Sequence, residues 1–157
     1  MVALLGFVGL CLLVGAADGA VTHAALGAWY GSLAKPPLTP PNWVFGPVWT
    51  TLYMLVGLSA WLVWREGDGD GEMRPVRPAL RLWGWQLLFN AAWTPAFFGL
   101  RNPALGLVVL VPLLVLIGLT MRAFARIRPL PAWVLAPYFA WSCFATWLNL
   151  GIWWLNH

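Results

Sequence analysis

The chain has 157 residues, of which 61% are apolar and only 9% are charged, and its mean hydropathy is +0.76. A typical soluble domain carries about 25% charged residues, so the composition excludes an ordinary soluble protein and predicts a surface that mostly faces lipid. The net charge of +4 comes from basic residues in short loops rather than on one face, which argues against a nucleic-acid partner.

Five long segments with few or no charges follow one another along the chain. A helix needs about 20 apolar residues to cross a bilayer, and the alternation expected of a membrane barrel is not visible. We therefore predict an all-α integral membrane protein, a bundle of five transmembrane helices forming one domain over residues 1–157. The predicted helices cover about residues 2–26, 43–64, 79–100, 103–125 and 130–155.

The first segment has a second interpretation, as a signal peptide, because residues 15–20 are mostly small, as at a cleavage site. No Lys or Arg precedes Lys35, so the positive region of a signal peptide is missing and we favour a retained helix. Asp18 is either a functional group within the span or, as we favour, an unpaired carboxylate in water at headgroup depth. His23 could offer an axial nitrogen to haem iron, but we favour a solvated imidazole beside the interface.

The connection at residues 27–42 contains two proline pairs, at 36–37 and 40–41. Proline fixes φ, so this segment is stiffer than a linker of Gly and Ser. It could fold over the mouth of the bundle as a lid. The residues alone equally allow a proline-rich linker whose Trp and Tyr side chains anchor it at the membrane interface.

Basic residues are divided unevenly between the two ends of the predicted bundle. Seven arginines lie at residues 65–81 and 122–128, whereas the loops at the other end hold only Lys35 and Arg101. We expect a multi-pass protein of a bacterial membrane, and in such a membrane the positive-inside rule predicts a cytoplasmic N-terminus. Residues 67–71 alternate Gly and Asp but lack the closing Glu of a calcium loop, so we predict a solvated turn there.

Polar and aromatic side chains recur on one face of three predicted helices. On the third helix, at 100° per residue, four of them fall within about 60° of one another: Gln86, Asn90, Trp93 and Phe97. Amides in hydrocarbon are unfavourable without partners, so this face should point into the bundle. Trp49 and Tyr53 lie one turn apart on the second helix. A face of the fifth helix holds Trp141, Phe144, Ala145, Leu148 and Asn149.

Pointing inward, these side chains would line a tall aromatic slot with a few amides. Such a slot suits a flat, largely apolar ligand, with ring faces on both sides and hydrogen bonds that orient it. Alternatively, Gln86 and Asn90 only hydrogen-bond between helices while the indoles pack. For the whole set under a proline-rich lid, we favour a binding cavity.

The same segments resemble the TspO/MBR (translocator protein) family. The order WY, KP, PP, W, GPVW and LY within residues 29–53 matches the first loop and second helix of the family. The third helix adds NAAWTP and FFG after Gln86, and the fifth adds PY, W, FAT and LN. The likeness covers residues 29–156, with a weaker match in the fourth helix.

The resemblance implies a membrane receptor, sensor or carrier that binds porphyrin-type ligands, such as protoporphyrin IX or haem, and isoquinoline-type molecules under the lid. It implies no obligatory cofactor and no metal site. Among the alternatives that it leaves open are porphyrin breakdown, with Trp49 and Trp141 as redox-active indoles, and sterol or small-molecule transport. The ligand-binding residues that we expect are Tyr30, Pro41, Trp49, Tyr53, Gln86, Asn90, Trp93, Phe97, Trp141, Phe144, Ala145 and Asn149.

Two features limit these alternatives. The spans hold almost no ionisable groups, so no acid–base pair for ordinary catalysis is visible, and we favour a binding protein over an enzyme. The sterol motif of the family places a Tyr and an Arg where Leu150 and Trp154 stand, so sterol binding is the weaker expectation.

The expected partners are the lipid bilayer, a porphyrin-type ligand and a second copy of the chain. Small residues four apart permit close helix contacts, at Ala92 and Ala96 and again at Ala136 and Ala140. Family members form homodimers, which the resemblance therefore implies here, although this spacing is common in apolar helices.

Overall fold

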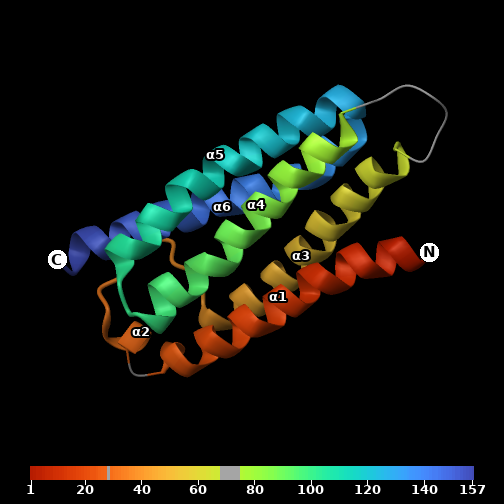
Figure 1. Ribbon diagram of the computed structural model, residues 1–157. Helices are drawn as coiled ribbons and strands as arrows, with labels where there is room; N and C mark the ends of the chain where they lie inside the picture. Colours follow the sequence, from red (N-terminus) through yellow and green to blue (C-terminus); the bar gives the residue numbers. More distant parts are fainter. Residues whose placement is uncertain (28, 68–74) are drawn as a thin grey trace.

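The computed structural model describes residues 1–27, 29–67 and 75–157, and these residues form a bundle of helices (Figure 1). The long helices and the two short elements match the predicted all-α class. They are α1 (Val2–Leu26), α2 (Trp29–Ser32), α3 (Asn42–Arg65), α4 (Val76–Thr94), the π-helical turn η1 (Pro95–Gly99), α5 (Pro103–Ile127) and α6 (Pro129–Leu155). The Gly/Asp turn predicted at residues 67–71 falls almost entirely outside the described residues.

Within the described part of the chain, α1, α3 and α5 are long and apolar enough to cross a membrane by length and composition. The two other long helices, α4 and α6, carry interior amides. Gln86 and Asn90 lie on α4, and Asn149 lies with several Trp and Pro residues on α6.

Several helix ends differ from the predicted bounds for local chemical reasons. Part of the predicted lid forms the short helix α2, and α3 begins one residue earlier than predicted, at Asn42. The predicted third helix divides at Pro95, where a wider turn begins and the Leu100 amide donates to the Pro95 carbonyl oxygen at 2.8 Å. Proline has no N–H to continue the α-helical ladder, and such π turns are the usual way a helix absorbs an extra residue.

The five long helices pack around a closed ring. Contacts run from α1 to α3, from α3 to α6, from α6 to α5 and from α5 to α4, and α4 with η1 returns to α1. The N-terminus lies at the end where α3 finishes and α4 starts, whereas α2 and the C-terminus lie at the opposite end (Figure 1). We call these the N-terminal end and the lid end.

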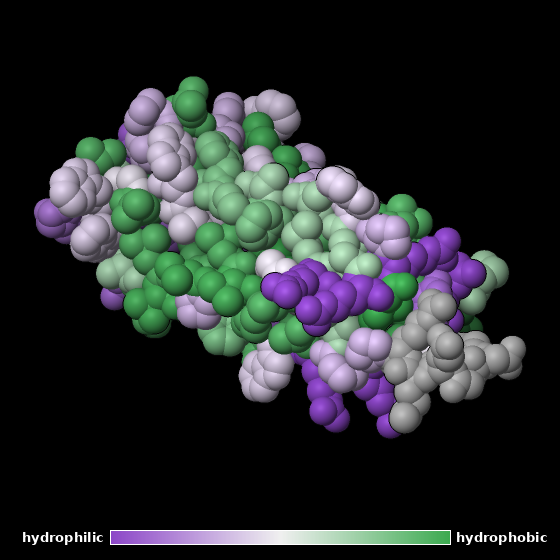
Figure 2. All heavy atoms as spheres, turned by 90° about the horizontal axis from the view of Figure 1, so that it is seen from above, coloured by the Kyte–Doolittle hydropathy of each residue, from purple (hydrophilic) through white to green (hydrophobic). Residues whose placement is uncertain are grey.

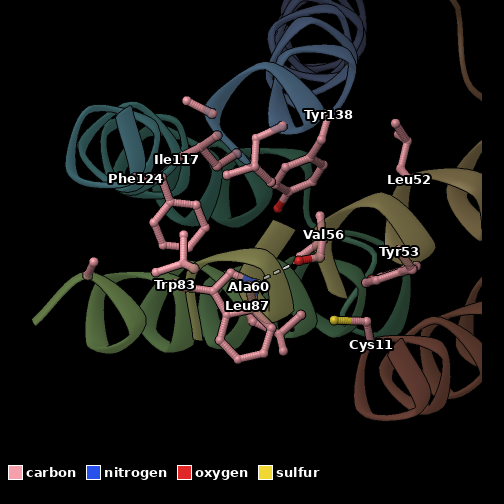
Figure 3. Close-up of a cluster of buried hydrophobic side chains, with 14 of the residues drawn as sticks. Cys11, Leu52, Tyr53, Val56, Ala60, Trp83, Leu87, Ile117, Phe124 and Tyr138 are labelled. Atoms are coloured by element: carbon pink, nitrogen blue, oxygen red, sulfur yellow. Dashed lines mark hydrogen bonds between the residues drawn. The ribbon is translucent and has the colours of Figure 1, made fainter. Parts of the chain in front are cut away.

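The N-terminal half of the ring is filled by close-packed apolar side chains. Ala60, Val63 and Phe124 have no exposed surface. Figure 3 shows Trp83 from α4 donating its indole N–H to the Val56 carbonyl oxygen of α3, at 3.1 Å. This packing satisfies the one polar atom of Trp83 and fixes the distance between two helices that make few other contacts.

The outer faces of the helices are apolar. Figure 2 shows hydrophobic residues over the middle of one face, with hydrophilic residues gathered toward one end of it. Large exposed side chains include Leu5, Leu13, Val108, Val111 and Val115. So much contiguous apolar surface is unfavourable in water but suits a hydrocarbon surrounding.

Candidate ligand cavity

A cavity of about 530 Å³ lies at the lid end, between α1, α3, α4 with η1, and α6, beneath α2. This volume falls within the range of pockets that hold drug-sized ligands, about 300–1,000 Å³. Its lining is mostly apolar, with a few polar side chains such as Asp18, Asn90 and Asn149. That mixture holds a ligand by its surface and orients it through a few polar contacts.

Aromatic rings form a continuous wall along the cavity. The Trp49 ring lies 5.7 Å from Tyr53 and 6.1 Å from Trp93 between centroids, with interplanar angles of 37° and 32°. Trp93 stacks on Phe97 at 5.7 Å and 29°. These separations are those of favourable aromatic pairs, so the wall is ordered without a ligand. A ligand in the cavity would lie against these rings.

A chain of hydrogen bonds leads from the cavity into the bundle. The Tyr53 hydroxyl lies 2.7 Å from Asp18 Oδ2 and 2.6 Å from Asn90 Oδ1, and its single proton serves one oxygen at a time. Asn90 Nδ2 donates to the Tyr138 hydroxyl at 2.7 Å, which donates to Gln86 Oε1 at 2.9 Å. The chain joins α1, α3, α4 and α6, and it gives partners to the Asn90 amide and to the Gln86 side-chain oxygen, which would be costly to bury alone.

Asn149 fixes the position of the Trp93 indole. Its Oδ1 accepts from Trp93 Nε1 at 3.2 Å, and its Nδ2 donates to the Pro103 carbonyl oxygen at 2.7 Å. The close approach depends on Gly106, because a Cβ atom there would lie 2.5 Å from Asn149 Oδ1. The ring at the centre of the wall is therefore held by α6 and by the start of α5.

The lid is tied to α6 and to η1. The Ala34 amide donates to Asn156 Oδ1 and the Ala34 carbonyl oxygen accepts from Asn156 Nδ2, both at 2.9 Å. Tyr30 is buried beside Phe97 and Phe98, and burial raises the pKa of its phenol above the usual value, so it stays a neutral hydrogen-bonding group at pH 7. Lys35 Nζ lies 4.7 Å from the centre of the Tyr30 ring. Specific contacts thus hold the lid in place, and its Tyr30 lines the cavity.

Known proteins resemble this chain over nearly its whole length. The TspO/MBR family matches residues 7–155. The chain belongs to the TspO/MBR family. One relative is the tryptophan-rich protein TspO of Chlorobaculum tepidum, 40% identical over 149 residues, which covers 95% of this chain and 92% of the relative.

Two further relatives carry names that describe a role. The human translocator protein is 43% identical over 129 residues, covering 82% of this chain and 75% of that protein. The tryptophan-rich sensory protein of Cereibacter sphaeroides is 38% identical over 128 residues, covering 82% and 77%. Family and apolar helices together identify an integral membrane protein, and the family supports a membrane receptor or sensor role. The orientation predicted from the basic residues stays a prediction.

In this TspO/MBR protein, eight of the twelve expected ligand-binding residues line the cavity: Tyr30, Trp49, Tyr53, Asn90, Trp93, Phe97, Ala145 and Asn149. Pro41, Gln86, Trp141 and Phe144 do not, and we remove them from the candidate site. Gln86 is buried one step behind the cavity, at the end of the hydrogen-bond chain. The Trp141 ring packs against Phe45 and Phe144, at 6.2 and 5.5 Å, beside the cavity rather than in it.

The contribution of α1 to the cavity was missed by the sequence analysis. Its lining residues are Leu12, Gly15, Ala16, Asp18, Gly19, Thr22, His23 and Leu26. The favoured interpretation of Asp18 as unpaired was wrong, because its carboxylate meets the Tyr53 hydroxyl. Asp18 and the small residues around it were the available signal, since a charged group within a span usually faces the protein interior.

Proposed function

We propose that this TspO/MBR protein is a membrane receptor, sensor or carrier that binds a flat, largely apolar ligand of the porphyrin type in the cavity under its lid. The observation that carries the proposal is the aromatic wall, in which Trp49, Trp93 and Phe97 line the cavity in consecutive ring contact. Extended π faces favour a ligand that is itself an extended, planar ring system.

The chemistry of the walls supports this ligand class. Asn90 and Asn149 have partners already, so they orient a ligand rather than bind it strongly. The acidic side groups of a porphyrin need a cation, and no Lys or Arg occurs among the described residues that line the cavity. Lys35 lies over the ring of Tyr30, which does line it. We infer that a porphyrin would place its acid groups toward the lid and its ring system deeper.

Porphyrin breakdown by Trp49 and Trp141 has less support as a function. The mechanism needs both indoles at the ligand. Trp49 lines the cavity, but Trp141 lies outside its lining. Sterol or small-molecule transport would use the same cavity and rests on no separate observation.

The proposal can be tested by filling the cavity. Ala145 lines it and is only 7% exposed, so an Ala145→Phe side chain would occupy the ligand space. Ala140, on the same helix, is exposed and outside the lining, so Ala140→Phe is the matched control. Protoporphyrin IX would be titrated into the detergent-solubilised protein, with its absorption band and fluorescence anisotropy as readouts.

We expect saturable binding by the unmodified chain and by Ala140→Phe, and at least about tenfold weaker binding by Ala145→Phe. Equal binding by both variants would place the porphyrin elsewhere on the protein. The same samples under illumination also separate binding from breakdown. A breakdown activity would bleach the porphyrin band and yield a product that is absent without protein.

A further inference from the structure

Asp18 is the one acidic side chain among the described residues that line the cavity, and that lining includes no Lys or Arg. His23, also on α1, is the one residue in this described lining that can carry a positive charge, and Lys35 lies at the lid over the Tyr30 ring. The electrostatic character of the deep part of the cavity is therefore set by one carboxylate. An ionised carboxylate in such surroundings is unfavourable without a counter-charge.

The carboxylate of Asp18 has hydrogen-bonding capacity left for a ligand. The Tyr53 hydroxyl lies 2.7 Å from its Oδ2. A carboxylate accepts at about four lone-pair positions, so this donor does not saturate it. Asp18 is partly exposed although its helix lies in the bundle, and the open space beside it is the cavity.

The aromatic wall lies next to this carboxylate. Tyr53 bridges the two, since its hydroxyl meets Asp18 while its ring lies 5.7 Å from Trp49, which in turn lies 6.1 Å from Trp93. Tryptophan faces attract cations through the negative potential above the ring, more strongly when water is excluded. A carboxylate beside several indole and phenol rings is the combination that recognises cationic ring systems and amines.

We propose that Asp18 makes the cavity select flat aromatic ligands that carry a positive charge or a basic nitrogen over neutral and anionic ligands of the same shape. This selectivity rests on the proposed function, because both concern the same cavity. It also defines how a porphyrin would lie, with its nitrogen-containing ring system toward Asp18. Its carboxylates would be repelled toward Lys35 at the lid.

The test compares three probes with a common three-ring frame: the permanent cation N-methylacridinium, neutral anthracene and anionic anthracene-9-carboxylate. Each would be titrated in an uncharged detergent at fixed pH, with the quenching of tryptophan fluorescence as readout. Asp18→Asn removes the charge but keeps a side-chain oxygen for Tyr53, and Asp18→Glu keeps the charge. Glu66→Gln removes one negative charge at the opposite end of the bundle, where Glu66 pairs with Arg128 at 3.0 Å, and is the matched control.

We expect the unmodified chain and Glu66→Gln to bind the cation about tenfold more tightly than the neutral probe, and the anion most weakly. Asp18→Asn should lose most of the preference for the cation while changing affinity for the neutral probe by less than about threefold, and Asp18→Glu should keep the preference. Equal binding of cation and neutral probe by the unmodified chain would overturn the proposal even if no variant folded. So would an undiminished preference in Asp18→Asn.

A separate outcome distinguishes this inference from the proposed function. If protoporphyrin IX fails to bind while the cationic probe binds through Asp18, the porphyrin proposal is wrong and the charge selectivity stands. If protoporphyrin IX binds in the cavity and the three small probes are not ranked by charge, only the charge selectivity is wrong.

Discussion

At the N-terminal end of the bundle, α1 lies directly against the backbone of α3, whereas at the lid end the same two helices enclose the cavity between them. The close contact depends on Gly57 of α3, where a Cβ atom would lie 2.6 Å from Val8 Cα and 2.9 Å from the Phe7 carbonyl oxygen. At the lid end, α3 instead presents the large rings of Trp49 and Tyr53, which line the cavity. One pair of helices thus serves as a packed core and as a binding wall.

Hydrogen-bonded polar side chains lie at the boundary between the packed N-terminal half of the bundle and the half that holds the cavity. A hydrogen-bond chain joins α3, α4 and α6, from Tyr53 and Asn90 in the cavity lining to Tyr138 and Gln86 behind it. In hydrocarbon such groups cannot find water, so they are stable only as a connected set. The comparison indicates that packing holds the N-terminal half together, whereas hydrogen bonds hold the helices in place where packing is given up for a cavity.

The largest expected effect comes from disturbing the packed half. Gly57→Ala would force a methyl group into the backbone of α1, which cannot move like a flexible side chain, and we expect the free energy of unfolding to fall by about 3 kcal/mol. Thermal unfolding in detergent, followed by circular dichroism, measures the change. Gly84→Ala is the control, since a Cβ atom there meets nothing within 4 Å, and it should retain or slightly raise stability. Equal melting of the two variants would contradict the tight α1–α3 contact.

A smaller effect is expected at the hydrogen-bond chain between the two halves. Tyr138→Phe leaves Asn90 Nδ2 and Gln86 Oε1 buried without the Tyr138 hydroxyl, at a cost of about 2 kcal/mol. The loss in free energy of unfolding would be measured by unfolding the reconstituted protein with increasing amounts of a denaturing detergent. Tyr30→Phe removes a hydroxyl that borders the cavity and should cost less than about 0.5 kcal/mol. If Tyr138→Phe were equally harmless, the chain would not hold the helices together.

The smallest effect on global stability is expected at the lid. Asn156→Ala removes both hydrogen bonds to Ala34, which weakens closure by about 1 kcal/mol and leaves the bundle intact. Amide hydrogen exchange in the lid should then be about fivefold faster, with unchanged exchange in α3 and α5. His157→Ala is the matched control, because His157 contacts Trp153 rather than the lid. Unchanged exchange after Asn156→Ala would mean that other contacts keep the lid closed.

The helices and the amide positions could be predicted because they follow from the cost of exposing polar groups to lipid. Charge-free runs gave the five long helices, and the face that holds Asn90 and Trp93 does point into the bundle. That cost is the same for a polar side chain that lines a cavity and for one that is buried in a hydrogen bond, so it could not distinguish the two. For that reason Gln86 was expected at the ligand, although it lies behind the cavity with Tyr138.

The aromatic residues and α1 mark where sequence reasoning failed. Indoles are accepted by lipid, by the interface and by protein interiors alike, so Trp141 and Phe144 carried no signal that they lie outside the cavity. α1 is apolar on all sides, so no face was distinguished except by Asp18. Two glycines of α1 line the cavity, but a Cβ atom at Gly15 would lie 2.6 Å from the Tyr53 ring, whereas one at Gly19 would meet nothing within 4 Å. The sequence alone cannot tell such a close contact from open space.

The π turn η1 has a consequence for how the pocket evolves. Its wider turn buries two successive rings, Phe97 and Phe98, whose centroids are 4.7 Å apart, at the junction of cavity and lid. Every residue after Pro95 is offset by one position from the continuation of a regular helix. Deleting a single residue here would therefore rotate Phe97 and Phe98 relative to Trp93 and present another side chain to the ligand without any substitution. Backbone register, as much as side-chain identity, defines what this pocket can recognise.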